Sequence, residues 1–148
     1  MSTEQNNTIL LVEDNSAHAE IVIRSFQDHH IANRIIHVLD GEAALDYLLH
    51  RGQFARVENS PRPRVILLDL RLPKIGGLQL LQEIKTHEAL SSIPVVILTT
   101  SEAEQDLTLA YANHANSYLV KPVDFAKFSQ LIDELGLYWL EWNRQPRS

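Results

Sequence analysis

Five polar residues that suit one kind of chemistry stand at the ends of apolar runs in this sequence. They are Glu13, Asp14, Asp69, Thr99 and Lys121. Carboxylates that share one cleft repel each other unless a cation joins them, and oxygen-only ligands favour a hard ion such as Mg²⁺. A hydroxyl and an ammonium group beside such a centre can hold the oxygens of a phosphoryl group in transfer. These residue types indicate magnesium-dependent phosphoryl chemistry, provided that the fold brings them together.

Asp69 is the central candidate of this set. It follows the uninterrupted apolar run Val65–Leu68, which is typical of a strand buried on both faces of a parallel sheet. In an open α/β sheet, ligands bind just beyond the carboxyl ends of the strands. The next helix is expected from Gly77, too far along the chain for Asp69 to cap its first turn. We therefore interpret Asp69 as a site residue.

The elements that must position these residues alternate along the chain. Strands are predicted at 8–12, 34–39, 65–68, 95–98 and 117–120, and helices at 16–27, 41–50, 77–86, 102–113 and from 125 onward. Such alternation predicts an α/β fold, with a five-stranded parallel sheet, right-handed crossovers and helices on both faces. Because parallel strands share one carboxyl edge, the five polar residues should converge there.

Short sequence motifs predict where several helices begin and where one long loop lies. Asp40 and Asp124 are predicted to cap the helices that follow them, and Ser101 with Glu104 has the spacing of a capping box. Segment 51–64 is polar, basic and contains two prolines, which predicts a long surface loop before the central strand.

Composition narrows the class of protein. The chain has 148 residues, enough for one domain with a real core, and 45% hydrophobic residues, a globular value. Its net charge of −6 makes nucleic acid an unexpected partner, and the lack of cysteine excludes disulfides and thiolate metal sites. The polar N-terminus is no signal peptide, and no apolar run reaches the ~20 residues that span a bilayer. We expect a cytoplasmic protein without membrane or nucleic-acid partners.

The order of the motifs resembles the receiver domain of two-component response regulators, which has a flavodoxin-like fold. The resemblance covers roughly residues 9–135. It rests on Glu13-Asp14, on Asp69 with Pro73 and Gly77 after it, and on Thr99, Tyr118 and Lys121-Pro122. Asp69 and Thr99 are 30 positions apart, and Thr99 and Lys121 are 22 apart. Each motif is weak alone, but this order on successive strand ends is specific.

The resemblance implies a role for each residue of the acidic cleft. Asp69 is implied to be the phosphoacceptor, which attacks a phosphohistidine on a partner histidine kinase. Asp14 and Asp69 are implied to bind Mg²⁺ directly, with Glu13 acting through water. The backbone carbonyl of Arg71 is implied to be a further ligand. Lys121 is implied to pair with a phosphoryl oxygen, and its bond to Pro122 is expected to be cis.

Thr99 and Tyr118 are implied by the same resemblance to be the switch. The hydroxyl group moves to the phosphoryl group, and the aromatic ring turns inward behind it. Simpler roles exist for these residues. Asp14 can be a helix cap, Thr99 an ordinary strand-end threonine, Lys121 a solvated lysine and Tyr118 a half-buried sheet aromatic. The seven histidines show no metal-ligand spacing and are interpreted as surface or packing residues.

Arg71 departs from the commoner receiver pattern, which has a small residue at this position. Its side chain is expected to point at the mouth of the site, where a guanidinium group would change the lifetime of the phosphorylated state. Arg71 also disfavours a rival function. A magnesium-dependent phosphatase with an aspartyl-phosphate intermediate typically has a second aspartate there. The five glycines form no nucleotide-binding motif, and retention of every reacting group argues against a degenerate receiver.

These features predict a regulator that is not an enzyme and that signals by protein contact. Residues 1–148 are expected to form one receiver domain, with its core at about 8–140 and no room for an output domain. The loop at 51–64 and the tail YWLEW further resemble stand-alone regulators of cyanobacterial phytochromes. Tyr138 and Trp142 favour a homodimer through the last helices and strand. A phosphorelay intermediate or a phosphate sink is the alternative.

Overall fold

The computed structural model describes residues 8–28, 34–56, 60–72, 75–100 and 103–143, without the side chains of residues 104 and 138–143. The strands are β1 (Thr8–Val12), β2 (Arg34–Val38), β3 (Val65–Leu68), β4 (Val95–Thr99) and β5 (Ser117–Val120). The helices are α1 (Ser16–Asp28), α2 (Gly41–Leu48), the short 3₁₀ helix η1 (Gly52–Phe54), α3 (Gly77–Thr86), α4 (Glu104–Ala112) and α5 (Phe125–Asn143). The predicted alternation of strands and helices is confirmed.

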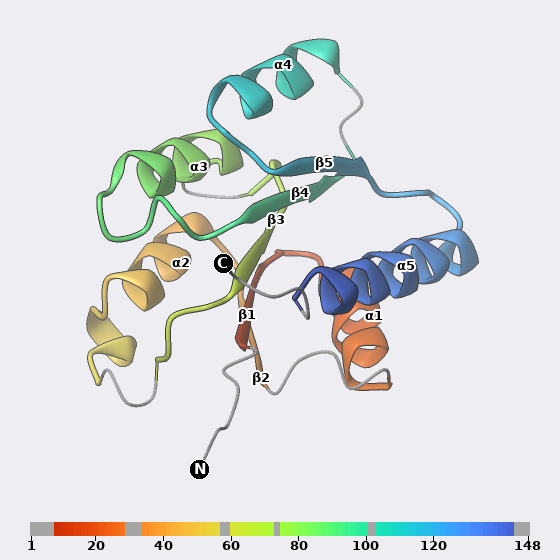
Figure 1. Cartoon of the computed structure of the whole chain (residues 1–148), viewed down its shortest axis with the longest axis horizontal. Coiled ribbons are helices and arrows are strands. Elements are labelled where there is room, and N and C mark those ends of the chain that lie inside the picture. The colour runs from red at the N-terminus through yellow and green to blue at the C-terminus, as the bar shows by residue number, and fades with distance from the viewer. Residues whose placement is uncertain (1–7, 29–33, 57–59, 73–74, 101–102, 144–148) are drawn as a thin grey trace.

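The five strands form one parallel sheet in the order β2-β1-β3-β4-β5 (Figure 1). Val12 is level with Val38 of β2 and with Leu68 of β3, and Leu68 is level with Ile97 of β4. Backbone bonds continue this register past the strand ends: Asp69 N donates to Val12 O at 3.1 Å. The carboxyl ends of the central strands are therefore aligned at one edge of the sheet.

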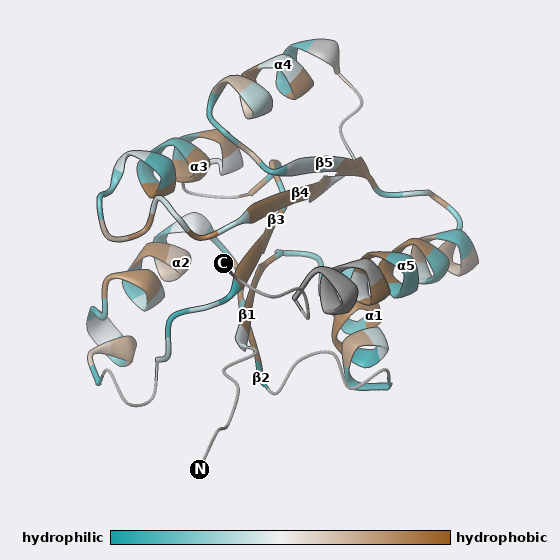
Figure 2. Ribbon diagram, in the orientation of Figure 1, coloured by the Kyte–Doolittle hydropathy of each residue, from teal (hydrophilic) through white to brown (hydrophobic). Residues whose placement is uncertain are grey.

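Two helical layers cover the sheet, α2, α3 and α4 on one face and α1 and α5 on the other (Figure 1). Alternate residues of each strand face opposite layers. Leu10 of β1 packs with Leu80 of α3, whereas its neighbour Leu11 packs with Phe26 of α1. Figure 2 shows the resulting run of hydrophobic residues through the central strands. Because both faces are covered, the central strands are apolar except for Thr8 at the start of β1 and Thr99 at the end of β4, as the sequence predicted.

The predicted helix caps have different outcomes. Asp40 accepts a hydrogen bond from Ala43 N at 2.8 Å, and Asp124 accepts one from Ala126 N at 2.7 Å, so both caps are confirmed. The N-cap of α4 is Ala103, whereas Ser101 lies outside the described residues. The start that the capping box predicted, at about residue 102, is therefore wrong by about two positions, a common error at helix ends.

The segment before β3 is anchored to the domain by Tyr47. The fully buried Tyr47 hydroxyl donates to Pro61 O at 2.6 Å, and its ring contacts that of Phe54 in η1 edge to face. Ser60 is also buried and donates to Phe54 O at 3.3 Å. The predicted surface loop thus includes residues that are part of the packed structure. Among the described residues, none of the helices has the length and hydropathy to cross a bilayer.

Candidate functional site

The turn between β1 and α1 holds one side of the site. Glu13 is buried, with 3% of the residue exposed, and its Oε2 accepts a hydrogen bond from Asn15 N at 3.1 Å. The side chain of Asn15 accepts one from His18 N at 3.0 Å and so caps α1. The simpler role for Asp14, a cap for this helix, belongs to Asn15 instead. Asp14 is exposed beside the buried Glu13.

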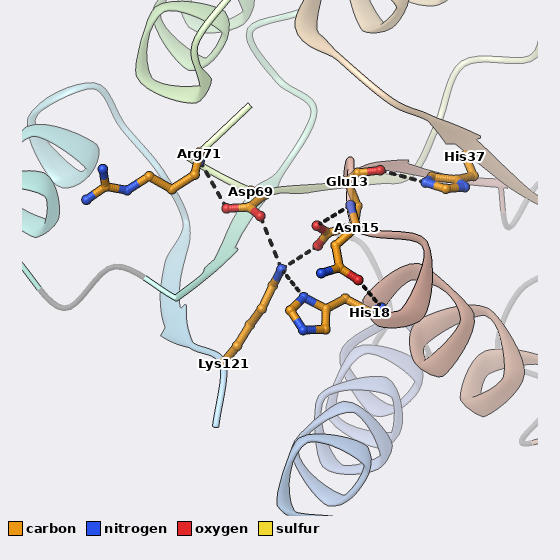
Figure 3. A network of polar contacts seen from close by, with 7 residues as sticks. All are labelled: Glu13, Asn15, His18, His37, Asp69, Arg71 and Lys121. Atoms are coloured by element: carbon orange, nitrogen blue, oxygen red, sulfur yellow. Dashed lines mark hydrogen bonds and ion pairs between the residues drawn. The ribbon is translucent and has the colours of Figure 1, made fainter. Parts of the chain in front are cut away.

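Lys121 joins this turn to β3. Its Nζ lies 2.5 Å from Oε1 of Glu13 and 3.1 Å from Oδ2 of Asp69 (Figure 3). The three side chains are 1%, 3% and 7% exposed, respectively, so the contacts are shielded from water. Lys121 N also donates to Thr99 O at 2.7 Å, which fixes the backbone of this residue at the end of β4. One ammonium group therefore bridges two buried carboxylates.

The acidic residues fit a hard cation. Glu13, Asp14 and Asp69 each offer a carboxylate oxygen, and these oxygens lie within 4.8 Å of one another. When all groups are ionised, three carboxylates and the Lys121 ammonium leave a formal charge of −2. All three donors are oxygens, which suit Mg²⁺ or Mn²⁺ better than a soft metal. The donor set is therefore appropriate for one divalent ion.

Burial dominates the electrostatics of Glu13. It raises the pKa of this carboxyl group to about 7, while the hydrogen bond and the charge of Lys121 act in the opposite direction. The nearby charge of Asp69 raises the pKa further. Without a second cation, the folded protein therefore disfavours the charged form of Glu13.

The backbone around Asp69 is held closely. Arg71 N donates to Asp69 Oδ1 at 3.0 Å, and Gly77 N donates to Leu70 O at 3.2 Å. A Cβ atom on Gly77 would come within 2.5 Å of the carbonyl oxygen of Asp69, so a side chain there would displace the acceptor backbone. This close approach explains why the loop after Asp69 ends in a glycine. Pro73 lies outside the described residues.

The side chain of Arg71 does not take the predicted direction. Its Nη2 lies 3.4 Å from Oδ2 of Asp106 on α4, and 64% of the side chain is exposed. Figure 3 shows the guanidinium group extending away from Asp69. The prediction that it points at the mouth of the site is wrong in this structure, because Asp106 supplies a carboxylate partner outside the cleft.

Thr99 and Tyr118 lie on the same side of the sheet. Thr99 ends β4 and is fully buried, two positions after Ile97 and hence on the same face of the strand. Ile97 is level with Tyr118 of β5, and both belong to the layer that packs against α2 and α3. Tyr118 is half-buried. The Lys121–Pro122 peptide is trans, so the expected cis bond is absent from this structure.

Two histidines belong to the site, although the sequence indicated only surface or packing roles. His18 Nδ1 lies 3.1 Å from Lys121 Nζ, and His37 Nε2 lies 2.7 Å from the carbonyl oxygen of Glu13 (Figure 3). His18 lies in the first turn of α1, four positions after Asp14, and this nearness to the acidic pair offers a signal in the sequence. His37 has no such signal, because it reaches the site from the neighbouring strand.

Comparison with known proteins agrees with this geometry. The family model of the response regulator receiver domain matches residues 9–133. The chain is 48% identical over 147 residues to the probable methanogenesis regulatory protein FilR2 of Methanothrix harundinacea, covering 99% of this chain and 92% of that protein. It is 41% identical over 143 residues to the response regulator Rcp1 of a Synechocystis species, covering 95% of each protein.

Solved structures give the same result. The chain resembles the Mn²⁺-bound form of Rcp1 with a TM-score of 0.87 and 40% identity, over 95% of this chain and 99% of that one. It resembles the phosphorylated cyanobacterial phytochrome response regulator RcpA with a TM-score of 0.88 and 35% identity, over 97% of this chain and all of that one. The parallel sheet, the acidic residues at its carboxyl edge and these likenesses agree: the chain belongs to the response regulator receiver domain family.

Proposed function

We propose that this protein is a single-domain response regulator that accepts a phosphoryl group on Asp69 from a partner histidine kinase. The observation that carries the proposal is the buried bridge from Lys121 Nζ to Glu13 and Asp69, with Asp14 beside it. A structural ion pair needs one carboxylate for one ammonium group. Three carboxylates around one lysine instead suit a site that receives more positive charge and a transferring phosphoryl group.

The reaction needs little covalent chemistry from the protein. A carboxylate oxygen of Asp69 attacks the phosphorus atom of a phosphohistidine. The P–N bond breaks, its electron pair stays on the imidazole nitrogen, and that nitrogen takes up a proton. Arg71 N and Lys121 Nζ contact opposite oxygens of Asp69 and hold the carboxylate in a fixed orientation. This fixed orientation is the protein's main contribution to the rate.

Asp14 and Asp69 would hold a divalent ion directly, Glu13 would act through water, and the backbone carbonyl of Arg71 would be a further ligand. That a structure of the relative Rcp1 is a Mn²⁺-bound form supports the binding of a divalent ion by this domain. When bound, Mg²⁺ neutralises charge on the transferring group. Lys121 pairs with a phosphoryl oxygen. The hydroxyl group of Thr99 donates a hydrogen bond to a second phosphoryl oxygen. The ring of Tyr118, on the same side of the sheet, then turns inward behind Thr99.

Acceptor identity is tested with acetyl phosphate and Mg²⁺. Intact mass should show one added phosphoryl group that is labile in acid and base. Asp69→Asn should abolish it, whereas Asp28→Asn, a matched change at an exposed helix end, should leave it unchanged. Phosphate recovered on a histidine or serine would contradict the proposal.

A phytochrome-type histidine kinase is the proposed partner. Support comes from RcpA, a phosphorylated cyanobacterial phytochrome response regulator whose structure matches 97% of this chain. FilR2, described as a probable methanogenesis regulator, makes a different sensor the alternative outcome. Phosphotransfer from a purified phytochrome kinase, compared with a kinase without a light-sensing module, decides between them. Onward transfer to a histidine phosphotransfer protein would instead indicate a phosphorelay intermediate.

A homodimer is part of the proposal. α4 exposes Leu107 (37%) and Tyr111 (50%) one helical turn apart, and α5 exposes Leu137 (50%). Between these helices in sequence, β5 is an edge strand, and among the described residues only β4 pairs with it. A second copy placed around a two-fold axis would cover the same residues on both chains. The side chains of Tyr138 and Trp142, which first indicated a dimer, lie outside the described part of the structure.

A further inference from the structure

His18 is the residue whose contact with the site the family motifs do not explain. Lys121 Nζ lies 3.1 Å from His18 Nδ1, in addition to its contacts with Glu13 and Asp69. An ammonium group has three N–H donors and no acceptor. Nδ1 must therefore accept the hydrogen bond, and the ring is neutral with its proton on Nε2. All three N–H donors of Lys121 are then in use.

The position of His18 is set from two sides. Its backbone N–H donates to Asn15 Oδ1 at 3.0 Å, which fixes the residue in the first turn of α1. Its ring meets the rings of Phe128 and Phe125 edge to face, with centroids 5.3 and 6.4 Å apart. Phe128 is fully buried in the core between α1 and α5. The imidazole thus reaches Lys121 from a packed position.

The three contacts of Lys121 differ in how easily they are given up. Glu13 is a buried carboxylate that phosphoryl transfer does not alter, and removing a hydrogen-bond donor from a buried charge is costly. Asp69 is the acceptor itself, and its second oxygen can still accept a hydrogen bond from Lys121 after the first has bonded to phosphorus. His18 is neutral and half-buried, so water can replace the lysine at Nδ1. Burial and the charge of Lys121 both lower the pKa of this imidazole, which agrees with a neutral acceptor.

We propose that His18 is a positioning residue that occupies the third N–H donor of Lys121 until a phosphoryl oxygen takes its place. The inference rests on the proposed function, because it assumes that Lys121 binds the phosphoryl group on Asp69. Lys121 keeps its bond to Glu13 and exchanges His18 for the new oxygen. His18 then competes with the phosphoryl group and holds the lysine ready in the unmodified protein.

The exchange is tested with beryllofluoride, a phosphoryl analogue that bonds to a carboxylate oxygen, in the presence of Mg²⁺. His18→Phe keeps a ring against Phe125 and Phe128 but removes the acceptor. It should bind beryllofluoride about fivefold more tightly, the factor equivalent to one hydrogen bond of about 1 kcal/mol. His18→Asn places a carbonyl oxygen near the position of Nδ1 and should restore the affinity of the wild type. His87→Phe is the control, because it makes the same substitution at an exposed histidine 69 positions after His18.

Nitrogen NMR of the imidazole gives a second readout that packing alone would not change. The Nδ1 resonance of His18 should show a hydrogen-bonded acceptor and should move when beryllofluoride is added. Unchanged or weaker binding by His18→Phe, or an Nδ1 resonance that does not move, would overturn the exchange. If the wild type fails to bind beryllofluoride, or Asp69→Asn still binds it, the proposed function fails as well. Thermal melts of each variant confirm that it is folded.

Discussion

Arg71 and Asp106 connect the loop after β3 to α4 through a contact of 3.4 Å between Nη2 and Oδ2. Arg71 lies in this loop, two positions after Asp69. α4 follows β4, the strand that ends in Thr99. The contact therefore joins the loop that follows the acceptor to the helix that follows Thr99. Because 64% of the Arg71 side chain is exposed, solvent screens this ion pair.

Arg71→Ala should therefore have a small effect on the phosphorylated state. We expect acetyl-phosphate labelling and spontaneous decay to stay within about fivefold of the wild type, since an exposed pair contributes at most about 1 kcal/mol. Asp106→Ala removes the other partner of the contact and should have an equally small effect on labelling and decay. A decay rate changed tenfold by Arg71→Ala alone would mean that the guanidinium group turns toward the phosphoryl group after transfer.

Lys121 should contribute strongly to the free energy of unfolding when no metal is present. Lys121→Met leaves Glu13 and Asp69 buried without their shared cation. Removing one partner of a buried ion pair costs about 3 kcal/mol. Urea unfolding in EDTA measures this loss, and Mg²⁺ should restore part of it. Lys127→Met, at an exposed position of α5, should cost little. Equal stability of Lys121→Met and wild type in EDTA would contradict the bridge.

Magnesium should stabilise the protein through Asp14. At a free Mg²⁺ concentration about ten times the dissociation constant, linkage adds about 1.4 kcal/mol. For a chain of this size the melting temperature should rise by roughly 3–5 °C. Asp14→Asn removes the exposed ligand and should abolish the shift, whereas Glu88→Gln, another exposed acid, should retain it. An equal shift in Asp14→Asn would place the ion elsewhere.

The convergence of Glu13, Asp69 and Lys121 could be predicted from the sequence, because it depends on regular features. Apolar runs identify the strands, the alternation with helices makes the sheet parallel, and parallel strands end at one edge. The residues that follow those runs must then lie close together. Asp40 and Asp124 were predictable for a similar reason, since a cap depends only on residues three positions away.

The contacts that the sequence did not predict depend on tertiary structure. Arg71 finds its partner 35 positions away on α4, and a long exposed side chain has many rotamers from which to choose. His18 meets Lys121 because α1 packs against the face of the sheet and so brings its first turn close to the residue that follows β5. The role of a single histidine cannot be derived from periodicity. Such contacts can be predicted only when the relative positions of several helices and strands are known.

Tyr47 should make the stability of the fold depend on pH in the alkaline range. Burial raises the pKa of this phenol to about 12, above its ordinary value of 10.0. The folded state therefore favours the neutral form, and this contribution is complete below pH 10 and decreases as the pH rises from 10 to 12. Tyr47→Phe also loses the hydrogen bond to Pro61 O, which contributes about 1 kcal/mol.

Urea midpoints of wild type and Tyr47→Phe between pH 8 and 12 measure both effects. The wild type should be more stable at pH 8, and the difference should decrease above pH 10. Tyr111→Phe is the control, because it removes a phenol hydroxyl from a residue that is 50% exposed. A difference between wild type and Tyr47→Phe that does not vary with pH would mean that the phenol is accessible to solvent.

The proposed homodimer gives a prediction for the surface of α4, β5 and α5. Aromatic and aliphatic residues are enriched at the centre of interfaces, whereas charged residues are depleted there. Tyr111→Glu places a carboxylate on this surface, and in a two-fold dimer each copy would bring the same charge to the interface. Val123→Glu is the matched control, since Val123 is 99% exposed in the loop before α5.

Sedimentation velocity at tens of micromolar protein, with and without acetyl phosphate and Mg²⁺, measures the result. The wild type should sediment as a dimer, and Tyr118 on β5 gives phosphorylation a route to strengthen the contact. Tyr111→Glu should shift the protein to monomer in both states, whereas Val123→Glu should leave the dimer intact. Since Tyr111 is exposed in the monomer, the substitution should not change the melting temperature at protein concentrations low enough to keep both proteins monomeric. A loss of dimer then cannot be attributed to unfolding. A wild type that remains monomeric in both states rules out the dimer, and a dimer that survives Tyr111→Glu must use another surface.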